Sequence, residues 1–147
     1  MTGRIVRLQV NGKPAPQGSK TRNRAGAVYE SSKAVGPWRE AVRAETQRAV
    51  DVPFDGAVRV ALTFVLPRPG GHFGTGRNAG VLRAGAPARP AGPPDLDKLV
   101  RAVLDGLTAG GALKNDAQVV ELYAMKVYPG EVRGWQAGCR IAIVEEE

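Results

Sequence analysis

The chain has 147 residues, of which 43% are hydrophobic, so it can bury one ordinary core and we expect a single domain. Its 21 Lys and Arg outnumber 14 Asp and Glu, and the net charge of +7 predicts an anionic partner, with nucleic acid first. One cysteine (Cys139) and one histidine (His72) exclude an intrachain disulfide and a zinc finger, and argue against His-Asn-His nucleases and serine-histidine-aspartate enzymes.

The compartment follows from the same counts. A single cysteine suits a reducing cytosol, the first twelve residues contain no apolar signal region, and no stretch approaches the roughly 20 apolar residues of a membrane span. We therefore expect a soluble cytoplasmic protein without membrane contact.

The first half of the chain predicts a helix between two strands. Residues 4–10 alternate apolar and polar side chains, as a strand does, and Asn11-Gly12 stops them. Pro37 suits the first position of a helix that extends to about Val50, with Trp38 on its apolar side. Residues 57–66 are apolar on both faces, which is typical of a strand in the middle of a sheet.

Two basic loops are expected, at about residues 11–30 and 67–94. Residues 13–24 are rich in Pro and Gly and carry four cations without an acid, so we expect no part of that run to close a core. The second loop has no periodicity and no acid, which predicts a mobile basic flap over a site; disorder without function is the alternative. For the first loop, the alternative to phosphate contact is a plain solvated loop. The cations of the two loops that we expect on DNA phosphates are Lys13, Lys20, Arg22, Arg24 and Arg77.

The strongest helix pattern lies between Pro94-Asp95 and Gly110-Gly111, where leucine and valine recur at three-and-four spacing from Leu96 to Leu107. Residues 117–128 and 136–144 then read as two strands, which we expect to pair antiparallel. Together these elements predict an α+β domain with a mixed, mainly antiparallel sheet of about four strands and two principal helices.

Three aspartates are the candidate catalytic and metal-binding residues. Asp95 and Asp97 open the strong helix, where helix capping is the purely structural alternative. Asp116 follows Asp97 by nineteen residues, enough chain to run out along the helix and return, so we expect the three carboxylates to converge. Clustered carboxylates in a protein that attracts polyanions make electrostatic sense with a hard divalent cation between carboxylate and phosphate, which indicates Mg²⁺, with Mn²⁺ as the substitute.

Cations accompany these aspartates. Arg101, one helical turn after Asp97, and Lys98 can hold a phosphate oxygen, although an ordinary Asp97–Arg101 pair on the helix face explains Arg101 equally well. Lys126 shares strand parity with Asp116 but lies about 33 Å along a straight strand, so we expect it on the flank of the DNA and not at the metal. Asp105 lies about 12 Å along the helix from Asp97, too far to share an ion.

These residues resemble a known family. The run from Pro94 to Leu99, with Leu104-Asp105-Gly106-Leu107 and the run from Asn115 to Val120, is similar to the core of the RusA-like Holliday junction resolvases over about residues 93–128. The run from Gly12 to Lys20 looks like the N-terminal signature of phage and actinobacterial members.

The resemblance implies a homodimeric, Mg²⁺-dependent endodeoxyribonuclease of a bacterial or phage-infected cell. Such enzymes cut four-way junctions by paired incisions in recombination and repair, without a nucleotide cofactor. Asp95, Asp97 and Asp116 fall on the family's metal-binding aspartates. Arg101 stands where a well-known member has a catalytic lysine. Lys98 replaces an asparagine of that member and Asn115 an aspartate, so this site is less acidic.

Two other functions stay open from the sequence. One is a less selective nuclease for branched DNA with the same metal chemistry. The other is a non-catalytic DNA-binding module, in which the aspartates only cap a helix and the basic loops do all the binding.

Overall fold

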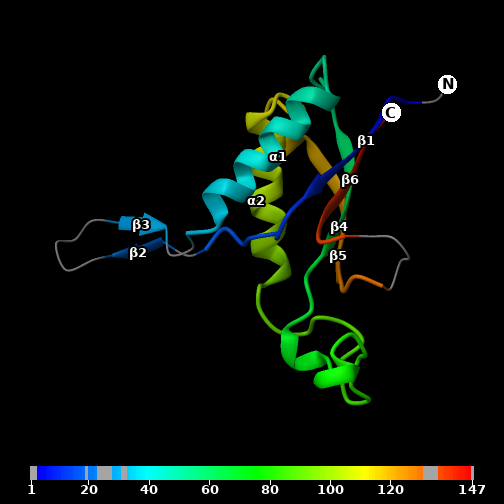
Figure 1. The fold of residues 1–147 in the computed structure, drawn as a ribbon. Coiled ribbons are helices and arrows are strands. Elements are labelled where there is room, and N and C mark those ends of the chain that lie inside the picture. The colour runs from blue at the N-terminus through cyan, green and yellow to red at the C-terminus, as the bar shows by residue number, and fades with distance from the viewer. Residues whose placement is uncertain (1–2, 19, 23–27, 31–32, 131–135, 147) are drawn as a thin grey trace.

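The computed structural model describes residues 3–18, 20–22, 28–30, 33–130 and 136–146. Its main sheet has four strands in the order β1-β6-β4-β5, and two helices cover one face of that sheet (Figure 1). The bounds of these elements are β1 Ile5–Asn11, α1 Val35–Ala49, β4 Val58–Val65, α2 Leu96–Ala109, β5 Val119–Val127 and β6 Gly138–Glu145. The predicted α+β class, with a mixed sheet and two principal helices, is confirmed.

The sheet is mainly antiparallel. β6 pairs antiparallel with β1 on one side and with β4 on the other, while β5 pairs parallel with β4. The expected antiparallel pairing of residues 117–128 with 136–144 is therefore wrong, because β4 lies between those strands. α2 is the crossover that returns the chain to the start of β4, and such a crossover places the next strand parallel to the first.

The core lies between the helices and the sheet. Trp38 and Val42 of α1 and Leu99 of α2 are at most 3% exposed, and they pack with Leu62 and Phe64 of β4 in one apolar cluster. Trp38 is thus the core anchor that its position predicts. Both faces of β4 are largely covered, as expected for an interior strand.

Two glycines let the helices approach closely. A Cβ atom built on Gly106 would lie 2.6 Å from Cγ1 of Val42, and one on Gly110 would lie 2.6 Å from Cβ of Thr46. Any larger side chain at these positions would separate α1 from α2.

The first basic loop contains more structure than its composition predicts. β2 (Lys20–Arg22) and β3 (Val28–Glu30) form an antiparallel hairpin beside the main body (Figure 1). The expectation that no part of residues 13–24 enters the core is wrong, because the small apolar side chain of Ala15 is only 2% exposed and belongs to the core cluster. The backbone N–H of Gln17 donates to the carbonyl of Lys98, which ties this segment to the start of α2.

The second basic segment, residues 67–94, folds on itself at one end of the molecule (Figure 1). It contains two short 3₁₀ turns, η1 (Gly70–His72) and η2 (Gly76–Asn78), and an antiparallel bridge between Phe73 and Leu82. Composition alone did not predict this local order, which is stabilised by hydrogen bonds of the backbone. Along the described part of the chain, no helix has the length and apolar character needed to cross a membrane.

Candidate active site

Asp95 and Asp97 stand at the start of α2. Asp95 occupies the N-cap position with extended backbone angles, yet its side chain makes no capping hydrogen bond. Its carboxylate is 59% exposed, and its Oδ2 lies 3.6 Å from Nζ of Lys98. Asp97 is exposed in the first turn. Capping by Asp95, the structural alternative, is thus not what the structure contains.

Lys126 holds the segment that leads into Asp95. Its ammonium group donates to the carbonyls of Gly92 and Pro94, each at 2.9 Å. Two of its three donors are therefore committed to backbone. β5 runs opposite to α2, so the end of β5 that carries Lys126 lies beside the start of the helix, a neighbourhood that spacing along the strand does not reveal.

Asp116 lies at the other end of α2. It begins the 3₁₀ turn η3 (Asp116–Gln118), and its Oδ1 accepts a hydrogen bond from the hydroxyl of Thr108 at 2.5 Å. Thr108 follows Asp97 by eleven helical residues, which is about 16 Å of helix rise. The expected convergence of the three aspartates within one chain is therefore wrong. Across the described ranges, no three acidic, histidine or cysteine side chains form a group that could hold a metal ion.

Asp105 is close to Asp116. The two residues line an open hollow of about 430 Å³ together with Thr108, Lys114 and Asn115. Helix rise separates Asp105 from Asp97, as expected, but Asp105 lies near Asp116. The signal was available, because Asp105 and Thr108 are three residues apart on a helix and so share a face.

The candidate cations fall into two groups. Arg101 is exposed one turn after Asp97, and none of the ion pairs among the described residues joins the two, so a simple helix-face pair does not account for Arg101. Lys98 is the partner of Asp95. In the basic loops, Lys13 and Arg77 are exposed. Lys20 and Arg22 belong to β2, and Arg24 lies outside the described residues.

Basic and acidic residues are distributed unevenly along the chain. Residues 1–94 contain 15 basic and 5 acidic residues, whereas residues 95–147 contain 6 basic and 9 acidic. Of the acids in the second part, Asp95 and Asp97 stand at the start of α2 and Asp116 lies just beyond its end, while the first part supplies the hairpin and residues 67–94. A polyanion attracted by the basic segments would meet carboxylates at the helix ends.

Comparison with known families decides the class. The family model described as Endodeoxyribonuclease RusA matches residues 11–134, a range that contains both basic segments and both ends of α2. The chain belongs to the RusA family. This match confirms the resemblance and indicates endonucleolytic cleavage of DNA as the activity of this protein. No curated protein matches the sequence.

Proposed function

We propose that this RusA-family protein is a Mg²⁺-dependent nuclease that resolves Holliday junctions by paired incisions during recombination and repair, acting as a homodimer. The observation that carries the proposal is the start of α2. There, two exposed carboxylates stand in a basic protein, and Asp95 makes no side-chain cap. Exposed carboxylates repel DNA phosphates and so lower the affinity for DNA. A nuclease offsets this repulsion with a bound cation, whereas a DNA-binding module without catalysis gains nothing from the carboxylates.

The donor set at the start of α2 fits Mg²⁺. That ion is commonly held by one or two carboxylates, with water and substrate phosphate completing its shell, and Asp95 and Asp97 offer oxygen ligands. When bound, Mg²⁺ supplies Lewis-acid activation of the phosphodiester. Mn²⁺ prefers the same ligands and is the substitute ion. Arg101 and Lys98 lie beside the carboxylates and would stabilise negative charge on the phosphate oxygens.

Asp116 enters the proposal through a second subunit. β5 is an edge strand of the main sheet, so one side of its backbone is unpaired in the monomer. Four of its large apolar side chains are at least 39% exposed; these are Val120, Leu122, Tyr123 and Met125. An exposed apolar edge of this kind is a template for pairing with another chain.

An antiparallel pair of β5 edges would complete the site. β5 begins near Asp116, at the C-terminal end of α2, and ends near Lys126, which contacts the segment before Asp95. A two-fold axis through the middle of paired β5 strands would therefore set the start of one helix beside Asp116 of the partner subunit. Each composite site would take Asp95 and Asp97 from one subunit and the third carboxylate from the other.

Cleavage of a synthetic four-way junction tests the proposed activity. We expect wild type to cut the junction with Mg²⁺, while Asp97→Asn abolishes cleavage and leaves junction binding equal or tighter, because repulsion of phosphate falls. Asp51→Asn, at an exposed acid just after α1, is the matched control for charge.

The substrates distinguish the alternatives. Equal cutting of flaps, junctions and duplexes would indicate a less selective nuclease, and tight junction binding without any Mg²⁺-dependent cutting would indicate a binding module. Normal cleavage by Asp97→Asn would remove Asp97 from the mechanism.

A further inference from the structure

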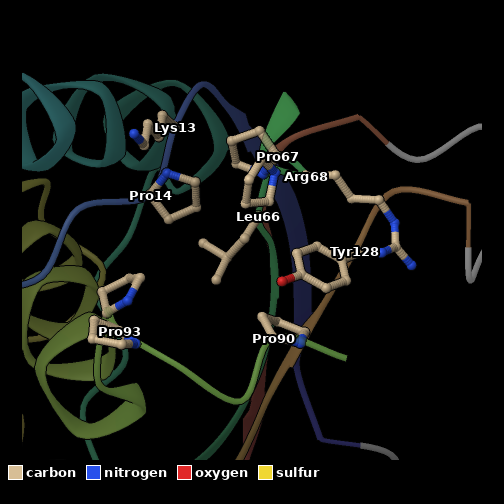
Figure 2. A pocket seen from close by; sticks show the side chains of 10 residues that line it. Lys13, Pro14, Leu66, Pro67, Arg68, Pro90, Pro93 and Tyr128 are labelled. Carbon is tan, nitrogen blue, oxygen red and sulfur yellow. The ribbon is translucent and has the colours of Figure 1, made fainter. Parts of the chain in front are cut away.

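A cavity of about 350 Å³ opens beside the start of α2 (Figure 2). Its walls come from the end of β4, from Tyr128 just after β5, and from the segment that precedes Asp95. Six proline rings line it, together with Leu66, Tyr128, Lys13 and the stem of Arg68, whose guanidinium points away from the cavity (Figure 2). A largely apolar cavity of this size with a few polar groups is the usual form of a small-molecule site.

The cavity is held in shape by contacts behind its wall. The guanidinium of Arg68 lies 4.2 Å from the centre of the Tyr128 ring, and the ring of His72 meets Tyr128 edge-on at 5.4 Å. Arg68 also donates to the carbonyl of Pro87 at 2.8 Å. The Tyr128 side chain is only 7% exposed, and its hydroxyl points into the cavity (Figure 2). The site is therefore preformed and does not need a ligand to order it.

These walls suit a flat, partly polar ring. Proline and aromatic rings stack on the faces of nucleobases, and a tyrosine hydroxyl can donate to or accept from a base edge. Lys13 is exposed where it lines the cavity and can meet the phosphate that accompanies the base. An apolar peptide side chain would use the prolines but would leave the lysine without a role.

The position of the cavity ties it to the scissile phosphate. Pro93 and Pro94 line the cavity, and Pro94 is bonded to Asp95. We propose that the cavity captures a nucleobase drawn out of its stack, from a nucleotide next to the phosphate at Asp95 and Asp97; this inference rests on the proposed nuclease function. A branch point is a favourable source of such a base, because unstacking costs least where pairing is already interrupted.

Abasic junctions test this proposal. The cut is first mapped with wild type, and single abasic sites are then placed at successive positions on either side of it. We expect an abasic site at one position beside the cut to slow cleavage about tenfold, the loss typical of one base-stacking contact. Abasic sites elsewhere are expected to leave the rate close to that of the intact junction.

A variant that blocks the cavity provides the second arm. Pro69 is an exposed lining residue, and Pro69→Trp places a large ring at the mouth. We expect this variant to slow cleavage of the intact junction about as much as the abasic site does, and to show no further loss on the abasic junction. Ala84→Trp is the matched control, since Ala84 is exposed on the same segment and does not line the cavity.

Tyr128→Phe keeps the ring and removes only the hydroxyl, so it supports the test if the tryptophan variant does not fold. It is expected to weaken discrimination among the four bases at the sensitive position. Base capture is refuted if no abasic position matters to wild type, or if Pro69→Trp slows intact and abasic junctions by equal factors. Absence of cleavage by wild type on every DNA would instead refute the proposed nuclease function, so the two failures are distinct.

Discussion

Mixing two inactive variants tests whether the site is shared between subunits. Asp97→Asn and Asp116→Asn are each expected to inactivate both sites of a homodimer. In a mixed dimer with composite sites, one site combines both substitutions and the other contains neither. The same mixture contains no intact site if each chain builds its own site.

The expected recovery can be calculated from the two-fold symmetry. With equal amounts of the two chains and free exchange, about half of the dimers are mixed and each has one intact site, so about one quarter of all sites should be active. Because a mixed dimer has only one working site, its products should be nicked junctions and few paired incisions.

The assay uses junctions labelled on each strand, with the variants purified separately and then mixed under conditions that allow subunit exchange. A mixture of Asp97→Asn with Asp95→Asn is the matched control, because both substitutions damage the same half of the site and leave no intact site in any dimer. If the first mixture cuts no faster than either variant alone, the composite site is wrong.

Three further predictions concern packing, positioning and DNA contact. Gly110→Ala should lower the free energy of unfolding, measured in urea, by about 1–3 kcal/mol, because the new Cβ would meet Thr46. Gly36→Ala is the control and should not destabilise the protein, because nothing lies within 4 Å of the new Cβ. Equal stabilities of the two variants would refute the close helix packing. Lys126→Met should reduce the single-turnover cleavage rate by up to about 100-fold with little change in junction affinity, since the carbonyl before Asp95 loses its anchor; an unchanged rate would deny it a positioning role. Replacing Arg22 and Arg24 with alanine should weaken binding and make the slope of log affinity against log salt shallower by up to about 1.8, and an unaltered slope would place both side chains in bulk solvent.

Local patterns predicted the elements of this fold well. The leucine and valine spacing of residues 96–107 predicted a helix, and the structure has one there with its apolar side buried. The run at 57–66, apolar on both faces, is an interior strand as predicted. The neighbours of each strand were harder to predict, because the local pattern of residues 117–128 is compatible with pairing to β6 and with pairing to β4. The crossover through α2 decides between these neighbours, and that is a property of the whole chain.

The candidate site shows the same division. Asp95 and Asp97 were found because they open a strongly periodic helix, a local feature. The place of Asp116 was mistaken because nineteen residues of chain allow convergence without requiring it. The length of α2 contained the answer, since Gly110 ends the helix at the far end and Asp116 follows within six residues.

In the proposed dimer, α2 also sets the distance between the two cleavage sites. Each chain gives Asp97 to one site and Asp116 to the other, and Thr108, whose hydroxyl donates to Asp116, lies about 16 Å from Asp97 by helix rise. Leu99, Val103 and Leu107 fix the helix in the core, so the two sites cannot move independently. Paired incision would then depend on the rigidity of this packing. Gly110→Ala, which separates α2 from α1, is therefore expected to raise the ratio of single nicks to paired incisions before it abolishes cleavage, and a constant ratio in a destabilised variant would refute this coupling.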